Sequence, residues 1–445
     1  MKRDSKKSNR GYAALALPLL AATMIHAADA PEAIPAVDVL GTKITLYGFA
    51  QLDMAYDNNR SGAGNLLPTM TTSTTATYTP KIVTVPGGIP ASGYADLAYY
   101  AYPQTKIKND GDWGITANNT RIGFALAGPD GTVYKLTGKI EADFSGGGTS
   151  TTASSNETNP VLRLRHAYGN IAFPKFGLSI LAGQTWDVIA PLNTPLINSA
   201  NLWSAGNIGA RRPQFRITEE IPVGPAKIIG QGALTRTIGP AGFINEADMG
   251  VATDMPSMQG RLAVSCPLWV DKQNFTIGAY GLWGKMEMDI DSVGTTRNLK
   301  TWAYGVDVEL PIVSMLSIVA EGYAGQNMGA YQGNIGQYFT QVGATIATVT
   351  EVQGFGGWAA LRFKPISRLT LNVGAGIDSV HTNTAALNTG RVKNESTFVN
   401  GFFNITKDIK VGVEYQYLAT TYKVPTGVKS LAELKRIQGT FVYGF

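Results

Sequence analysis

The sequence predicts an all-β protein: a transmembrane antiparallel β-barrel of about 16 strands, with short turns at one end and long loops at the other. Three observations predict this fold class. Many segments alternate apolar and polar side chains, which is the period of a β-strand. After the first 30 residues, no apolar stretch is long enough for a transmembrane helix, so a closed barrel is the remaining way to span a membrane. The chain also ends on an alternating strand, 434–445, whose last residue is Phe445.

The first residues predict a cleaved secretory signal peptide over 1–28. Five basic residues lie within the first ten, an apolar run covers 11–25, and small residues follow, which is the pattern of such a signal. A transmembrane anchor is the alternative, but the apolar run is too short to span a bilayer as a helix. We expect cleavage near 27–30 and a short periplasmic lead over 29–41.

Composition narrows the possible functions. The chain has 37 basic and 32 acidic residues, and removing the five bases and one acid of the signal leaves 32 against 31. A nearly neutral mature chain gives no reason to expect a nucleic-acid partner. A single cysteine, Cys266, excludes an internal disulfide framework, and the histidines show no metal-ligand spacing. No metal or other cofactor is expected.

The barrel is predicted over 42–445 as strand pairs joined by short turns. The turns 128–131 (GPDG) and 222–225 (PVGP) have typical hairpin sequences. Long polar segments separate the pairs, and the first of them, 58–114, is expected to be a long extracellular loop. An even strand count places both ends of the chain on the periplasmic side. The expected strands are 43–57, 115–127, 132–144, 161–172, 178–186, 211–221, 227–237, 258–268, 275–289, 298–310, 315–326, 350–363, 369–381, 395–405, 409–422 and 434–445.

Alternation within the strands assigns their two faces. In 409–422, for example, Val413 and Tyr415 lie on one face and Lys410 and Glu414 on the other. Lipid outside and water inside account for this pattern. A water-soluble barrel with the faces inverted would show the same period, so the assignment depends on the signal peptide and the aromatic last strand. The bilayer of a bacterial outer membrane is the expected surrounding.

Several segments resemble the DcaP-like outer-membrane porins. They are KITLYGFAQLD at 43–53, NTRIGF at 119–124, RLRHAY at 163–168 and LAGQTWD at 181–187, together with the last strand. The resemblance covers the first half of the mature chain, and the second half is similar only in its strand rhythm. It implies a sixteen-stranded, typically trimeric barrel associated with uptake of dicarboxylates and other anions. It also implies that the barrel-assembly machinery reads the last strand through Phe441, Tyr443 and Phe445. The chain lacks the heptad-like segment that some family members carry before the first strand, so no periplasmic coiled coil is implied.

The loop 188–209 is predicted to fold into the barrel and form its constriction. By strand count it is the third external loop, which folds inward in general porins. Its apolar content fits packing against the inner wall. A surface loop that contacts a neighbouring subunit is the alternative. The residues expected at the constriction are Pro191, Asn193, Pro195, Asn198 and Trp203.

Arginines that are out of phase with the lipid-facing residues predict a positively charged lumen. The loop 188–209 contains no acid to offset them. Rings of arginine favour anions, and guanidinium groups bind carboxylates with two hydrogen bonds. Alternatively, these arginines pair with lumen acids such as Glu141 and Asp143 and only brace the wall. The expected anion-selecting residues are Arg121, Arg163, Arg165, Arg212, Arg216 and Arg261.

These features predict a porin: a water-filled channel for passive diffusion of small hydrophilic solutes, with a preference for anions such as small carboxylates. Two alternatives stay open. A phospholipase-like barrel enzyme would need a nucleophile, a base and an orienting group, and neither His166 nor His381 has such partners nearby in the sequence. A structural or adhesion barrel would have a blocked lumen, which is typical of fewer strands. No enzyme activity is expected.

Overall fold

The computed structural model describes residues 36–58, 112–129, 131–146, 160–240, 248–289, 296–341, 349–381, 391–422 and 431–445. The predicted signal peptide, the first part of the lead and nearly all of the 58–114 segment lie outside the described residues.

Within the described residues, no helix combines the length and the apolar character needed to cross a membrane.

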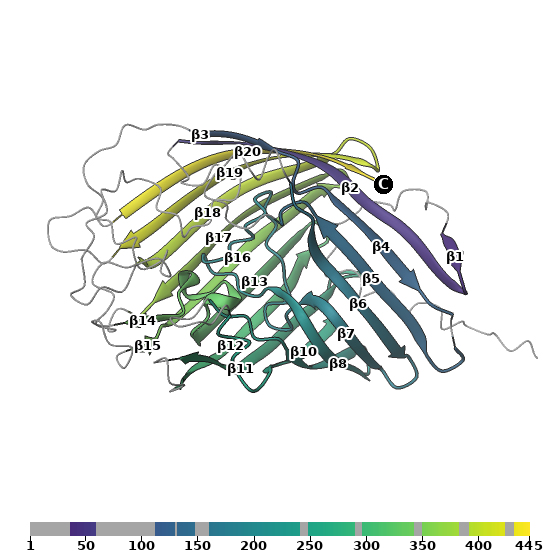
Figure 1. Cartoon of the computed structure of the whole chain (residues 1–445). Helices are drawn as coiled ribbons and strands as arrows, with labels where there is room; N and C mark the ends of the chain where they lie inside the picture. Colours follow the sequence, from purple (N-terminus) through teal and green to yellow (C-terminus); the bar gives the residue numbers. More distant parts are fainter. Residues whose placement is uncertain are drawn as a thin grey trace, which may run out of the picture.

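Antiparallel strands curve into a closed barrel (Figure 1). The wall closes where β2 (Thr42–Asp57) pairs with β20 (Leu431–Gly444), from Phe49↔Gly444 to Asp57↔Arg436. Counting β3 and β4 as one position, the described wall has sixteen strands, as the alternation predicts. The strands between β2 and β20 are β3 (Asp112–Thr116), β4 (Arg121–Ala127), β5 (Lys135–Asp143), β6 (Arg163–Phe173), β7 (Leu178–Trp186), β8 (Arg211–Val223), β9 (Ala226–Thr235), β10 (Ser257–Pro267), β11 (Asn274–Asp289), β12 (Thr296–Val313), β13 (Leu316–Gln326), β16 (Gln353–Ile366), β17 (Leu369–Val380), β18 (Arg391–Asn404) and β19 (Ile409–Tyr422).

The predicted second strand, 115–127, is split into β3 and β4. Both strands pair with β2: β3 pairs with one half of it and β4 with the other half. The break is a turn closed by a hydrogen bond from the Thr120 amide to the Ala117 carbonyl, 2.9 Å. Asn119, inside the turn, donates to Asp53 Oδ2 at 2.6 Å. Asparagine favours such turns because its side chain competes with the backbone for hydrogen bonds.

Part of the predicted lead also forms a strand. β1 (Val37–Val39) pairs with the start of β2, from Val37↔Ile44 to Val39↔Thr42. The two are joined at Leu40 and Gly41, both with positive φ. The lead therefore begins the sheet with a short hairpin.

Side-chain burial follows the predicted faces of the wall. On β20, Ile437 and Tyr443 are about half exposed on the outside, whereas Arg436 is buried inside. Arg436 pairs with Asp57 across the closing seam, with Nε–Oδ1 2.7 Å and a second bond of 2.6 Å. An apolar outer face around a charged interior is the arrangement of a membrane barrel.

The seam depends on a glycine opposite the last residue. The Gly48 amide and carbonyl exchange two 3.0 Å hydrogen bonds with Phe445. A Cβ on Gly48 would lie 2.8 Å from the Phe445 ring and would clash with the Arg121 carbonyl oxygen. We expect Gly48→Ala to destabilise the barrel by about 1–3 kcal/mol.

The loss of stability is measured as a lower temperature at which the folded band disappears on a detergent gel. Gly230→Ala on β9 is the matched control, because no atom lies within 4 Å of its Cβ position. Equal losses in the two variants would contradict a role for the seam.

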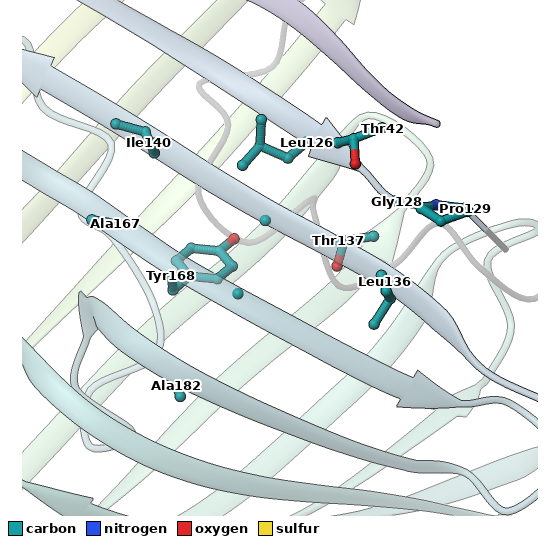
Figure 2. Close-up of a pocket in the computed structure, with 12 residues that line it drawn as sticks. Thr42, Leu126, Gly128, Pro129, Leu136, Thr137, Ile140, Ala167, Tyr168 and Ala182 are labelled. Atoms are coloured by element: carbon teal, nitrogen blue, oxygen red, sulfur yellow. The ribbon is translucent and has the colours of Figure 1, made fainter. Parts of the chain in front are cut away.

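A hollow of about 480 Å³ lies over β4–β7. Gly138 pairs directly with Gly169, and Gly169 with Ala182, so three adjacent strands carry small residues in one row. Figure 2 shows Leu126 and Ile140 at the border of this row. The small residues are in phase with the lipid-facing ones, so the hollow belongs to the outer surface and not to the lumen.

Candidate functional site in the barrel interior

The segment 187–210, between β7 and β8, lies inside the barrel; we call it the inner loop. Its backbone amides donate to carboxylates on distant strands. The Leu192 amide donates to Glu321 Oε1 at 2.7 Å and the Ile197 amide to Glu414 Oε2 at 2.8 Å. Because Glu321 is on β13 and Glu414 on β19, the loop runs along the inner face of the wall opposite the strands from which it starts.

Apolar packing holds the inner loop on this wall. Leu202 and Ala205 are almost completely buried, and Leu192 and Leu196 pack beside them. Gly206 has φ +115°, and a Cβ there would collide with the backbone of Gly357. Burial of apolar area stabilises this contact by about 25 cal/mol per Å². The wall residues in the cluster are Val319, Trp358, Ala360, Phe398, Leu418 and Leu434.

The acids of this wall are covered by the loop. Glu414 is fully buried and also accepts from the Asn198 amide at 3.1 Å and from Asn400 Nδ2 at 2.8 Å. Glu321 is likewise buried, and Trp358 Nε1 donates to it at 3.1 Å. The loop residues 188–209 carry no charged side chain. Where the loop covers this wall, the surface that faces the remaining lumen therefore carries no charge.

The opposite wall, β4–β8, carries more cations than acids. Arg163 binds Asp143 with two hydrogen bonds, 2.9 and 2.6 Å. Arg165 binds Glu141 at 2.7 Å and Asp143 at 2.9 Å. Lys139 also pairs with Glu141, at 3.1 Å. Two carboxylates, those of Glu141 and Asp143, therefore form ion pairs with three cations.

Three further arginines on this wall have no carboxylate within 4 Å among the described residues: Arg121, Arg211 and Arg216. Arg121 lies over the Phe49 ring at 5.2 Å, and its buried Nε has no hydrogen-bond partner. Arg211 lies over the Trp186 ring at 4.7 Å. Arg216 donates to the Trp186 carbonyl. These cations keep charge that the wall does not neutralise.

Four arginines of β4–β8 are close enough for their charges to act on one another. The charges of Arg163 and Arg165 act on both Arg121 and Arg211. We call Arg121, Arg163, Arg165, Arg211 and Arg216 the basic wall. It faces an uncharged loop, so the field across the remaining lumen is one-sided.

Two arginines that the sequence assigned to anion selection have other positions. Arg212 is fully buried at the base of the inner loop and pairs with Asp187 at 2.8 Å. Arg261, on β10, binds Asp307 on β12 through two hydrogen bonds, one of 2.9 Å. Phase placed both on the inner face, where each forms an ion pair with an acid; their part in anion selection stays a prediction.

Arg211 is not among the arginines that alternation predicts to face the lumen. Strict alternation puts Arg211 outside, because Arg212 and Arg216 point inside. Arg211 is the first residue of β8, directly after the inner loop, and the charges of Arg163 and Arg165 act on it. The signal available was Trp186, its direct partner across β7 and β8.

A register shift places His166 inside the barrel. The pairing of β5 with β6 shifts between Glu141 and Ala142, so both Arg165 and His166 point inward and are buried. A bulge of this kind adds a residue to one strand and re-aims its side chains. His166 is therefore an interior residue, with Nδ1 3.0 Å from Thr185 Oγ1.

The five loop residues named from the sequence are distributed along the inner loop. Asn198 is buried and donates to Gln416 on β19 at 2.8 Å. The Pro195 carbonyl accepts from β18 at 2.7 Å. Asn193 is exposed and Pro191 half-buried. The Trp203 ring lies 6.1 Å from that of Trp186, beside the basic wall.

In the part of the chain that the structure describes, no group of three or more His, Cys, Asp or Glu side chains could hold a metal ion.

The chain matches no protein-family model and no curated protein sequence. Solved structures do share its fold. The outer membrane channel DcaP of Acinetobacter baumannii superimposes with a TM-score of 0.67 at 16% identity, covering 93% of this chain and 100% of that one. An anion-selective porin from Comamonas acidovorans gives 0.53 at 11% identity, covering 91% and 100%. Salmonella typhi OmpF gives 0.50 at 11% identity, covering 91% and 98%.

These identities show the fold and nothing finer. The neighbours are outer-membrane channels and porins, and the described wall has the apolar exterior and closed ladder that such a membrane requires. The described wall of the chain is a sixteen-stranded antiparallel β-barrel, and it shares its fold with DcaP and with these porins.

Proposed function

We propose that the chain is a porin, a water-filled channel for passive diffusion of small hydrophilic solutes that prefers anions such as small carboxylates. The observation that carries the anion preference is the charge distribution inside the barrel. Arg121, Arg211 and Arg216 lie on one wall without a carboxylate partner, and the loop opposite is uncharged over buried acids.

Physical chemistry supports this reading. A negative solute that enters the narrowed lumen meets unpaired guanidinium groups in a partly dehydrated passage, where charges are screened less than in bulk water. Guanidinium groups also match the two oxygens of a carboxylate. The fold likeness to a porin described as anion-selective agrees with the proposal. Residues 188–209 of the inner loop are then the constriction, with Asn193 exposed and Trp203 beside Trp186.

A conductance measurement tests the proposal. We expect the purified mature chain to form stepwise conductances in planar bilayers, with a reversal potential of anion-selective sign in a KCl gradient. Absence of steps from correctly folded protein would refute the channel, and a cation-selective sign would refute the anion preference alone.

The interior gives little support to an enzyme. His166 does lie between Thr185 (3.0 Å) and Glu141 (3.9 Å), the order of a nucleophile, a base and an orienting acid. However, all three are buried, and Glu141 already binds Arg165, Lys139 and the Tyr47 hydroxyl. We infer that this group is structural and that the chain is not an enzyme.

Two partners stay predictions. Recognition by the barrel-assembly machinery through Phe441, Tyr443 and Phe445 agrees with their outward position, and loss of outer-membrane yield on removal of Phe445 would test it. A homotrimer is proposed from the sequence resemblance, and native mass spectrometry of the detergent-extracted protein would test it.

A further inference from the structure

A second segment enters the barrel between β13 and β16. Residues 327–338, which we call the strut, contain two short 3-10 turns, η3 (Gly329–Tyr331) and η4 (Asn334–Gly336), drawn as green coils in Figure 1. After the strut, β14 (Phe339–Gln341) pairs with β15 (Val349–Glu351) apart from the barrel wall. The sequence predicts no role for the strut, because its polar and glycine-rich composition is that of an ordinary loop.

The strut is attached to the wall at buried points. The Asn327 amide donates to the Val352 carbonyl at 2.8 Å. The Ile335 amide donates to Asp378 Oδ2 at 3.1 Å, and Tyr323 donates to the other oxygen of Asp378 at 2.9 Å. Ile335 has φ +57°, which is rare for a β-branched residue and costs conformational energy. The surrounding contacts hold this conformation.

The strut is also bonded to the inner loop. The Ser204 amide donates to the Gln332 carbonyl and the Gly209 amide to the Tyr331 carbonyl, both at 2.8 Å. Ile189 and Ile208 of the loop pack in one buried cluster with Met328 and Tyr331 of the strut. The two segments therefore form one packed unit inside the barrel.

Arg212 joins this unit to the base of the loop. Its guanidinium pairs with Asp187 at 2.8 Å, lies 3.9 Å over the Tyr331 ring and donates to the Ala330 carbonyl at 3.0 Å. Asp187 in turn accepts from the Ala210 amide at 2.8 Å, which closes the base of the loop. A planar guanidinium can stack and bond in its plane at the same time, which an ammonium group cannot.

We propose that the strut fixes the position of the inner loop, with Tyr331 and Arg212 as the positioning residues. This inference rests on the proposed channel function, because it assigns the strut to the constriction. Without the Tyr331 ring, the loop keeps its bonds to Glu321 and Glu414 but loses support on the side of its return to β8. The loop then moves, and the width of the passage fluctuates.

Three variants test the proposal: Tyr331→Ala, Arg212→Lys and, as the matched control, Tyr331→Phe. We expect stepwise fluctuations in the open-channel current of Tyr331→Ala, smaller ones for Arg212→Lys, which keeps the charge but loses the stacked plane, and wild-type traces for Tyr331→Phe. Folding of each variant is checked by the shift of the barrel on a detergent gel before recording.

Hydrogen exchange provides a readout that does not need conduction. The amides of Ser204 and Gly209 should exchange several-fold faster in Tyr331→Ala than in Tyr331→Phe, while amides of β19 stay unchanged. Steady currents and unchanged exchange at these two amides in folded Tyr331→Ala would overturn the proposal. Absence of conductance in the wild type would refute the channel function, and the exchange result would still decide whether the strut holds the loop.

Discussion

Replacing Arg121, Arg211 and Arg216 together by glutamine is expected to remove most of the anion preference. These three cations have no carboxylate partner in the described residues, so their charge is available to a passing solute. An anion about 4 Å from one such charge gains about 1 kcal/mol even at the dielectric constant of water. We therefore expect the anion-to-cation permeability ratio to fall on the order of tenfold.

The ratio is measured from the reversal potential in a KCl gradient at low ionic strength, because salt screens exposed charges over about 10 Å at 0.1 M. Lys272→Gln is the matched control, since it removes one positive charge from an exposed turn between β10 and β11. An unchanged ratio in the triple variant would show that the basic wall does not set selectivity.

The basic wall also shows what the sequence could and could not predict. Alternation correctly placed Arg121, Arg163 and Arg165 on the inner face, because the pleat of a strand fixes the side of each residue. It could not say which of them meet an acid, since that depends on the neighbouring strand and on the register between the two. Arg163 meets Asp143 because these residues are direct partners in the β5–β6 ladder.

Long-range contacts could not be predicted from the sequence for the same reason. Arg212 is neutralised by Asp187, 25 residues earlier, and contacts Ala330, 118 residues later. Neither partner is visible from the period of β8. The strut 327–338 is a similar case: its buried residues are spaced irregularly, so no strand or helix period marks them as part of the interior.

Excision of the outer part of the inner loop, replacing 192–205 by a short glycine–serine linker, is expected to raise single-channel conductance several-fold. Residues 187–191 and 206–210 stay, so the base at Asp187 and Arg212 is kept. The removed part contains Leu202 and Ala205, which cover the apolar patch on the wall. The sixteen-stranded ladder holds the barrel closed without them, because its hydrogen bonds do not involve the loop.

The same excision should also weaken the anion preference, for two separable reasons. A wider water path places solutes farther from the basic wall, where screening is stronger. It also uncovers Glu321 and Glu414, which the loop amides bind in the intact chain, and two exposed carboxylates attract cations. Selectivity is therefore expected to fall further than widening alone would cause.

Combining the excision with Glu321→Gln and Glu414→Gln separates these two effects. We expect this variant to keep the high conductance while part of the anion preference returns, since the passage stays wide but the uncovered charges are gone. If excision leaves conductance unchanged in a correctly folded barrel, the narrowest point of the channel lies elsewhere. If the added glutamines leave selectivity unchanged, the loop acts on selectivity through width alone, and its cover over the acids has no electrical effect on the lumen.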